Sequence, residues 1–164
     1  MTDLSPLFTP ITINGCMLAN RIVMAPMTRA FATDGVLAET GIDYYRRRAE
    51  GGVGLILTEG IAVSEIGSYN ASIPGFSPGP ALERWRQAVA AVHDAGGRIM
   101  AQLWHTGHGR IREQAADPTR PSIGPVATYL AEDSPLIAEG GTYGPGEAMT
   151  VGDIDNAIVE YAEA

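Results

Sequence analysis

The sequence has 164 residues, of which 45% are hydrophobic and 18% are charged, and its 19 acidic and 11 basic residues give a net charge of −8 at pH 7. This composition is typical of a globular protein, and the acidic balance argues against a nucleic-acid-binding surface. All 11 basic residues are arginine, which excludes a P-loop lysine, a Schiff-base lysine and any other catalytic lysine.

The first twenty residues predict an irregular lead-in that contains a β-hairpin. Asn14-Gly15 is a favourable two-residue turn, and the short apolar segments Thr12-Ile13 and Met17-Leu18 flank it.

Three short apolar runs predict β-strands, at residues 21–25, 53–58 and 98–104. Each run is bounded by Gly, Pro or Asn and is too short for a confident helix. Nearly continuous apolar character is typical of strands that are buried on both faces, as in parallel sheets.

Helical patterns follow each of these runs, at residues 37–50, 81–95 and 153–164. Their apolar positions lie three or four residues apart, which places them on one face of each helix. These positions are Ile42, Tyr45 and Ala49, then Leu82, Trp85, Val89 and Val92, then Ile154, Ala157, Ile158 and Tyr161. Glycine pairs end the first two helices, and Thr150 or Asp153 can cap the third. Alternation of strands and helices predicts an α/β fold with parallel strands.

The segment 105–152 is rich in Pro and Gly and fits no regular element. A loop of this length in a compact domain is usually functional, so we expect a lid or a capping subdomain. A disordered insert is the alternative interpretation.

Polar side chains follow or end the three predicted strands, where parallel α/β folds carry their chemistry. Thr28 offers a hydroxyl, Gln102 an amide, and Gly60 a backbone that a ligand can approach closely. With Trp104 as an aromatic wall, this set suits a planar heterocycle with polar edges better than a hydrolytic triad. The alternative is that Thr28 and Gln102 are internally satisfied polar groups of a barrel layer.

Other polar clusters favour simpler interpretations. His105 and His108 have metal-like spacing, but they lie in a Gly-containing loop without an evident third ligand, so we expect no metal site. The run 46–48 of three arginines predicts a solvated or ion-paired helix face. Cys16 is the only cysteine; it can form neither an internal disulfide nor a zinc site, and we expect it to be a buried inert thiol.

Targeting and membrane signals are absent from the sequence pattern. No apolar run approaches the ~20 residues of a membrane span, and the first ten residues do not resemble a secretory signal. We therefore expect a cytoplasmic protein without membrane or nucleic-acid partners.

Several ordered blocks carry a resemblance to a known family. They are LFTPITING at the start, NRIVMAPMTR at 20–29, YYRRRAEGGVGLILTEG at 44–60, GGRIMAQLWHTG at 96–107 and MTVGDIDNAIVEYAEA at 149–164. From about Leu7 to the last residue, the sequence resembles the N-terminal part of the old yellow enzyme family of FMN-dependent ene-reductases. Blocks in this order and at this spacing are much more specific than any one short motif.

The resemblance implies a fold and a reaction. The family fold is a (β/α)8 TIM barrel that binds FMN at its carboxyl face, so residues 1–164 are expected to be the N-terminal portion of one such barrel. This portion comprises about the first three β/α units, with 105–152 as the lid or capping subdomain. The implied activity passes a hydride from NAD(P)H through FMN to the β-carbon of a small activated alkene.

The resemblance also implies roles for individual residues. Cofactor contacts are expected from Ala25, Pro26, Met27, Thr28, Gly60 and Gln102. Among these, the Thr28 hydroxyl is expected near the flavin C4 carbonyl as the catalytic group that helps to set the redox potential. Gln102 is expected to bond the pyrimidine edge, and Gly60 to lie beside the ring. Tyr69 and Trp104 are expected to line the substrate side.

The sequence departs from the family pattern in two ways. His108 stands where the family usually has Arg, with Arg110 coming later, which predicts a variant loop and leaves the substrate preference open. The family's substrate-binding His-x-x-(His/Asn) pair, which follows the fourth strand, is absent. Since three strands cannot close an eight-stranded barrel, we expect a complementary C-terminal barrel fragment as a second chain, and the assembled barrel could form homo-oligomers.

Two alternatives remain at this point. The chain could be a non-catalytic half-barrel that serves as a scaffold or binding module. It could also belong to a dienoyl-CoA reductase-type flavin barrel, whose iron–sulfur cluster one cysteine cannot hold.

Overall fold

The structure is a computed structural model that describes residues 2–127 and 146–164. Its strands are β1 (Ile11–Ile13), β2 (Cys16–Leu18), β3 (Val23–Met24), β4 (Leu55–Ala62), β5 (Ile99–Trp104), β6 (Ile123–Gly124) and β7 (Glu147–Ala148). Its α-helices are α1 (Glu39–Glu50), α2 (Pro80–Asp94) and α3 (Val151–Glu163), and short 3₁₀ helices are η1 (Ser5–Phe8), η2 (Gly107–Gly109) and η3 (Arg112–Gln114).

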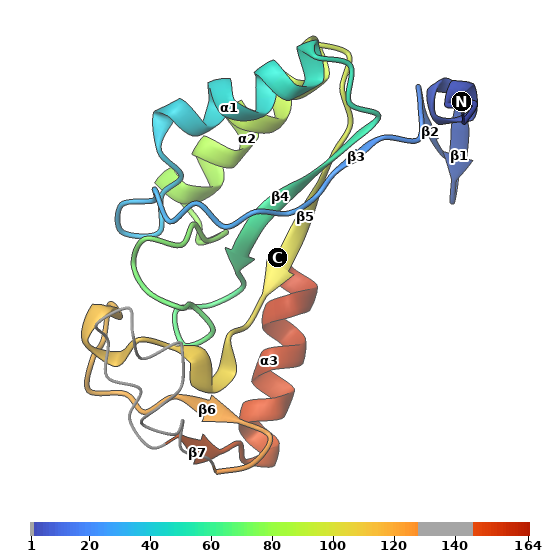
Figure 1. Ribbon diagram of the computed structural model, residues 1–164. Helices are drawn as coiled ribbons and strands as arrows, with labels where there is room; N and C mark the ends of the chain where they lie inside the picture. Colours follow the sequence, from blue (N-terminus) through green and yellow to red (C-terminus); the bar gives the residue numbers. More distant parts are fainter. Residues whose placement is uncertain (1, 128–145) are drawn as a thin grey trace.

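The central feature is a parallel sheet of β3, β4 and β5, in that order, which confirms the predicted α/β alternation. Helices α1 and α2 connect these strands and lie together on one side of the sheet (Figure 1). Pro80 opens α2 at the first helical position, where its missing N–H costs nothing. Strand neighbours that follow one another in sequence are the arrangement expected for a portion of a (β/α) barrel.

The core lies between the sheet and these two helices. It comprises Leu37, Tyr45, Ala49, Ile56, Ile61, Trp85, Ala88 and Val92. The predicted apolar stripe of α1 is therefore confirmed. That of α2 is confirmed at Trp85 and Val92 only, because Ala88 lies in the core and Leu82 and Val89 do not. Strand β4 is longer than predicted: it continues from Thr58 through Gly60 to Ala62, because Ile61 re-enters the core beyond the glycine.

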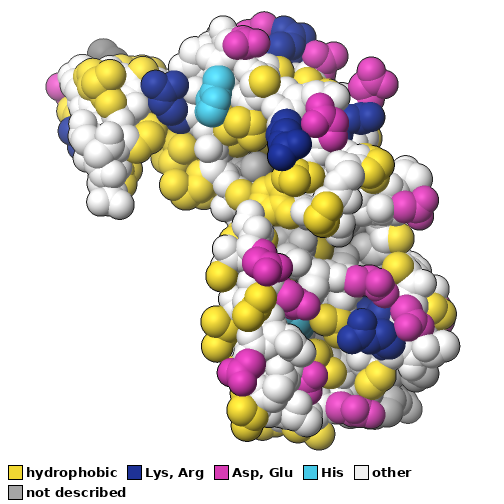
Figure 2. All heavy atoms as spheres, turned by 180° about the vertical axis from the view of Figure 1, so that it is seen from behind, with side chains coloured by type: hydrophobic (Ala, Val, Ile, Leu, Met, Phe, Trp, Pro, Cys, Tyr) yellow, Lys and Arg dark blue, Asp and Glu magenta, His cyan; other side chains and the backbone are white. Residues whose placement is uncertain are grey.

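The opposite face of the sheet is open in the part of the chain that the structure describes. Met100 on β5 is 57% exposed and Val23 on β3 is 44% exposed. The prediction that the strands are buried on both faces is therefore correct for β4 but wrong for β3 and β5. Hydrophobic side chains also reach the surface in the middle of the view in Figure 2.

The predicted hairpin is confirmed. Strand β1 pairs antiparallel with β2, with Ile11 opposite Leu18, and Asn14 and Gly15 both have positive φ, at 45° and 83°. Leu18 is buried, whereas Cys16 is exposed. The expectation of a buried thiol was therefore wrong, because Cys16 directly follows the turn, where no described residue covers it.

Helix α3 begins two residues earlier than predicted. Of the two predicted caps, Thr150 is its N-cap and forms a reciprocal capping box with Asp153. Its apolar stripe is not packed: Ile158 is 63% exposed and Ile154 and Tyr161 are also exposed. The reason is its position, since α3 lies beyond the carboxyl end of β5, away from α1 and α2 (Figure 1).

The sequence suggested that the segment 105–152 contains no regular element, but the structure shows several in it. It contains η2, η3 and the short parallel pair of β6 and β7, with Ile123 opposite Glu147. Residues 128–145 of the expected lid lie outside the described residues. Across the described ranges, no helix is both long and apolar enough to cross a membrane.

Candidate functional site

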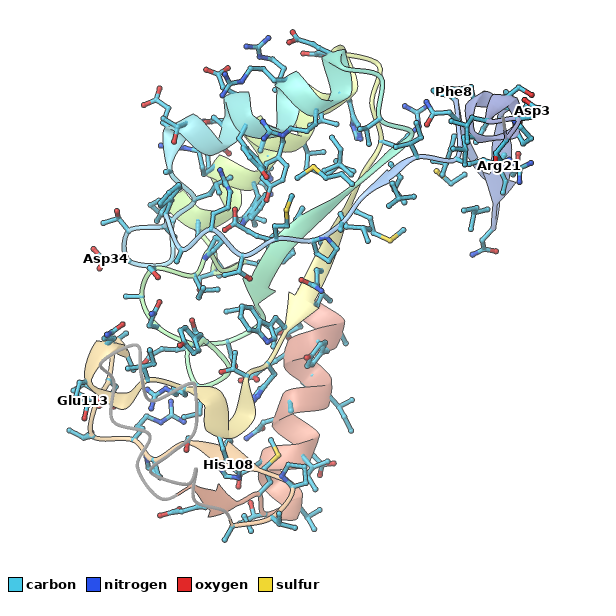
Figure 3. All side chains as sticks on the ribbon, in the orientation of Figure 1. Asp3, Phe8, Arg21, Asp34, His108 and Glu113 are labelled. Carbon is cyan, nitrogen blue, oxygen red and sulfur yellow. The ribbon has the colours of Figure 1, made fainter. Side chains whose placement is uncertain are left out.

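The predicted site residues come from three neighbouring strands. Residues 25–28 directly follow β3, while Gly60 lies within β4 and Gln102 within β5. Gly60 and Gln102 are direct partners in the parallel ladder. The sheet thus brings the residues predicted from separate motifs to the carboxyl end of adjacent strands. Figure 3 draws the described side chains on the ribbon.

A bulge in β4 determines which face these residues occupy. Leu57 pairs with Met100 and Gly60 pairs with Gln102, so two residues of β4 lie opposite a single residue of β5. Thr58 stabilises the irregularity, because its hydroxyl accepts a hydrogen bond from the Gln102 backbone N–H at 3.0 Å. The bulge turns Gly60 to the same face as Gln102, the open face of the sheet.

Thr28 and Gln102 both have polar groups available for a ligand. Both residues are exposed, and neither the Thr28 hydroxyl nor the Gln102 side-chain amide has a hydrogen-bond partner among the described residues. Within the described part of the chain, these two groups are therefore not internally satisfied, in contrast to the alternative interpretation of the sequence. Met27 is also exposed, whereas Pro26 is half-buried.

Gly60, Trp104 and Tyr69 form a compact cluster beside these polar groups. A Cβ atom on Gly60 would overlap the Trp104 indole, so only glycine fits with the ring in this position. The Tyr69 and Trp104 rings are stacked, with centroids 6.5 Å apart and planes inclined by 10°. The two residues predicted to line the substrate side therefore lie together.

A buried ion pair lies directly behind this cluster, and sequence reasoning missed it. The Arg29 guanidinium donates to the Glu59 carboxylate, which is 1% exposed, and Tyr45 donates to the same carboxylate. The available signal was a glutamate inside an apolar strand, since a buried carboxylate requires a partner. The partner itself was not evident because Arg29 and Glu59 are 30 residues apart.

The two histidines that follow β5 have local structural roles. His105 Nδ1 accepts the Gly107 backbone N–H at 3.1 Å, and burial lowers the pKa of His105. His108 Nε2 lies 2.7 Å from the Val126 carbonyl oxygen, to which it can donate. No group of three or more His, Cys, Asp or Glu side chains among the described residues could hold a metal ion.

Arg110 belongs to the loop that the sequence predicts to be variant, and its side chain lies inside that loop. It is buried, and its guanidinium donates to the carbonyl oxygens of Asp117 and Arg120 at 2.8 Å each. This arginine therefore organises the loop 110–120 from within.

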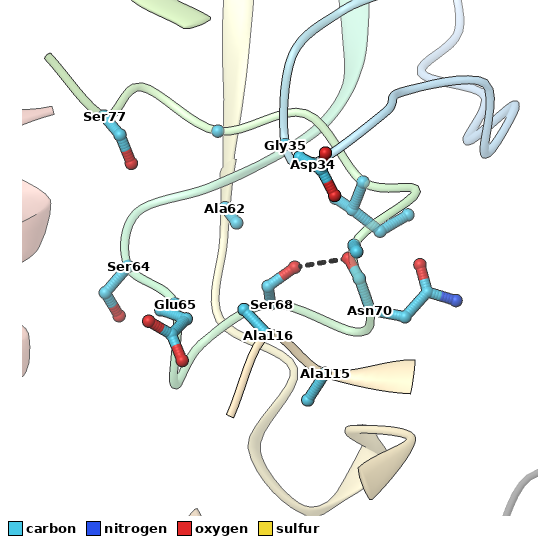
Figure 4. A pocket seen from close by; sticks show the side chains of 13 residues that line it. Asp34, Gly35, Ala62, Ser64, Glu65, Ser68, Asn70, Ser77, Ala115 and Ala116 are labelled. Carbon is cyan, nitrogen blue, oxygen red and sulfur yellow. Dashed lines mark hydrogen bonds between the residues drawn. The ribbon is translucent and has the colours of Figure 1, made fainter. Parts of the chain in front are cut away.

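A cavity of about 270 Å³ lies between the loops after β3 and β4 and the segment 115–116 (Figure 4). Its lining mixes small apolar residues with polar ones, which include Asp34, Ser64 and Asn70. None of the predicted cofactor or substrate residues lines it, so the cavity and the candidate site are separate.

Comparison with known proteins identifies the family of this chain. Residues 6–164 match the model of the NADH:flavin oxidoreductase / NADH oxidase family. A flavin oxidoreductase of Emericella nidulans is 35% identical over all of this chain. Among solved structures, an old yellow enzyme homologue from Zymomonas mobilis is 32% identical over 94% of this chain, with a TM-score of 0.81. Morphinone reductase in complex with tetrahydroNAD is 31% identical over 94% of this chain, with a TM-score of 0.83.

The chain spans less than half of each of these proteins. It covers 42% of the Emericella nidulans relative, 42% of the Zymomonas mobilis chain and 44% of morphinone reductase. The three parallel strands are accordingly a partial TIM barrel rather than a closed one. By its family match and its fold, the chain belongs to the NADH:flavin oxidoreductase / NADH oxidase family, the family of the old yellow enzymes.

Proposed function

We propose that the protein is an FMN-dependent NAD(P)H oxidoreductase that reduces activated C=C bonds, and that this chain supplies one part of the flavin site. The observation that carries the proposal is the pair of exposed polar side chains, Thr28 and Gln102, which flank Gly60 at the carboxyl end of a parallel sheet. The names of relatives support it, since one is a flavin oxidoreductase and another was solved with a nicotinamide compound.

The residues fit the polar edge of a flavin. The Thr28 hydroxyl can donate or accept one hydrogen bond, and the Gln102 amide can do both at once, which matches alternating carbonyl and N–H groups. Gly60 lets the β4 backbone approach the ring closely. FMN, when bound, supplies the hydride-transfer chemistry.

The chain's own residues would bind the cofactor and tune it. Ala25, Pro26 and Met27 offer backbone contacts beside it, and Thr28 is the proposed catalytic residue. By hydrogen bonding at the C4 carbonyl, Thr28 would adjust how readily the flavin accepts electrons. Tyr69 and Trp104 would form the wall against which a small alkene lies.

We further propose that a complementary C-terminal part completes the barrel. Strands β3 and β5 are the two edges of the sheet, and each has only one strand neighbour among the described residues. Open edges and an exposed apolar face favour pairing with further strands. This observation also favours an incomplete barrel over a self-sufficient scaffold module.

Native purification tests the proposed function. We expect these residues to purify with the rest of a barrel, in the same polypeptide or in a second one, with a flavin absorbance spectrum and with NAD(P)H-dependent reduction of an enone. Mass spectrometry identifies the polypeptides. A 17.3 kDa chain that purifies alone and binds no FMN would contradict the proposal.

Substitutions then test the residues. Thr28→Ala should weaken FMN binding by about five- to tenfold, since it removes one hydrogen bond to the flavin. Gln102→Ala should weaken it at least as much, since it removes two. Thr40→Ala and Gln87→Ala are matched controls at exposed positions on α1 and α2. Equal FMN affinity in all four variants would refute these assignments.

A further inference from the structure

The ion pair behind the candidate site is unusually complete for a buried group. Glu59 Oε1 accepts hydrogen bonds from Arg29 Nε at 3.0 Å and Nη2 at 2.6 Å, and Oε2 accepts the Arg29 backbone N–H at 3.4 Å. The Glu59 side chain is 1% exposed and that of Arg29 is 12% exposed. A charge pair this far from water is costly to desolvate and is therefore weak evidence for a role in stability alone.

Tyr45 of α1 completes the network. Its hydroxyl donates to Glu59 Oε1 at 3.1 Å and accepts the Glu59 backbone N–H at 3.0 Å. The Arg29 guanidinium lies over the Tyr44 ring, 4.0 Å from its centroid, which shields the cation from water. Burial raises the pKa of Tyr45, so the hydroxyl stays protonated and keeps its donor role.

This network holds the loop that follows β3. Among the described residues, Arg29 makes all the hydrogen bonds of residues 27–31, and each of them goes to Glu59. The next residue, Ala30, has a φ of 55°, a left-handed conformation that a non-glycine residue keeps only where its surroundings impose it. The loop conformation therefore depends on Glu59.

The two ends of the network are the neighbours of two predicted flavin residues. Arg29 directly follows Thr28 in the loop after β3, and Glu59 directly precedes Gly60 in β4. The β4 bulge makes this possible, because it turns Glu59 toward α1 while Gly60 faces the open side of the sheet.

We propose that Glu59 is a positioning residue of the flavin site: through Arg29 it holds the Thr28 hydroxyl at a set place relative to Gly60 and Gln102. The proposal rests on the proposed function, because it names what the ion pair does for that site. Glu59 touches neither cofactor nor substrate in this role, and it acts only through the loop.

Glu59→Gln tests the proposal in the whole protein, because it removes the charge and keeps the shape. In the FMN-free protein, amide hydrogen exchange at Arg29, whose backbone N–H donates to Glu59 Oε2, should become about tenfold faster or more, since the charged acceptor is lost. In the FMN-loaded protein, FMN affinity should fall by about tenfold. Glu50→Gln is the matched control, because it removes the exposed carboxylate partner of Arg46 on α1.

A double-mutant cycle separates positioning from general structural support. If Glu59 acts through Thr28, the effects of Glu59→Gln and Thr28→Ala on FMN affinity should be strongly non-additive. Additive effects, or unchanged amide exchange at Arg29, would overturn the proposal. Tyr45→Phe removes the two hydrogen bonds of the hydroxyl but leaves the Arg29–Glu59 ion pair in place. It should give a smaller change in the same direction, which keeps the test valid if Glu59→Gln does not fold.

The two proposals can fail separately. A parent protein that binds no FMN would refute the proposed function and, with it, the flavin part of this inference. Amide exchange can be measured without flavin. Slow exchange at Arg29 in the parent and fast exchange in Glu59→Gln would therefore still show that Glu59 fixes the conformation of the loop. Equal exchange in a parent that does bind FMN would refute the inference and leave the function standing.

Discussion

Individual side chains decide how the site is built, and Gly60 is the clearest case. Its Cα lies so close to the Trp104 indole that any side chain must displace the ring. The glycine also lies directly opposite Gln102, so the ring, the amide and the bare backbone share one small region. Substitution at this residue should therefore affect both stability and the substrate wall.

We expect Gly60→Ala to destabilise the fold by about 1–3 kcal/mol, the usual cost of forcing extra atoms into a packed site. Urea denaturation measures the change. Gly109→Ala is the control, because the nearest atom to its added Cβ would be 3.9 Å away. A loss no larger than that of the control would show that Trp104 moves aside freely.

Tyr45 gives the protein a specific dependence on pH. Burial raises the pKa of its hydroxyl above the ordinary value near 10, so above that pH the unfolded chain releases a proton that the folded chain retains. The free energy of unfolding should therefore fall as pH rises beyond about 10, with a limiting slope of about 1.4 kcal/mol per pH unit.

Urea denaturation of the parent and of Tyr45→Phe between pH 9 and pH 11 measures this effect. The stability difference between the two proteins should shrink as pH rises, because only the parent has the hydroxyl. Parallel curves for the two proteins would mean that Tyr45 titrates normally.

At the scale of the elements, local sequence patterns specify where helices and strands begin and end. The Asn14-Gly15 turn, the apolar stripe of α1 and the Thr150 cap of α3 all lie where the sequence predicts them. Strand β4 is the exception. Its bulge depends on the Thr58 hydroxyl meeting a backbone N–H of β5, which is 44 residues away.

The Thr150–Asp153 capping box should determine how firmly α3 begins. Thr150→Ala removes the hydroxyl that accepts the Asp153 backbone N–H at 3.2 Å, so amide exchange in the first turn should become about fivefold faster. Asp155→Asn is the control within the same helix. Equal exchange in both variants would show that the box is not formed in solution.

The same box should weaken in acid. Hydrogen bonds from Thr150 hold the pKa of Asp153 below its ordinary value, so its contribution is present above about pH 4 and is lost as pH falls through the lowered pKa. Exchange in the first turn of α3, corrected for the intrinsic pH effect, should therefore speed up only as pH falls below about 4.

At the scale of the whole molecule, the exposed apolar surface is the dominant feature. Met100 on the sheet and Ile158 on α3 are both more than half exposed, and both edges of the sheet are open. Surfaces of this kind in a monomer usually mark a site of association. This is the physical basis for expecting a complementary barrel part.

Met100→Glu should reduce association through the open face of the sheet. When the 164-residue chain is expressed alone, we expect this variant to self-associate at least about tenfold less than the parent, because a charge in an apolar interface must be desolvated. Analytical ultracentrifugation measures this, and Gln87→Glu, on the exposed side of α2, is the equal-charge control. Equal association of both variants would exclude the open face as the interface.

The sequence by itself determined the order of strands and helices, and its motifs marked residues that the sheet then brought together, such as Gly60 and Gln102. Such features depend on patterns a few residues long, so they can be recognised without the fold. Only the tertiary structure decided the bulge in β4, the Arg29–Glu59–Tyr45 network and the exposed stripe of α3. Each depends on which distant segment, if any, meets a given residue, and local propensity carries no information about that contact.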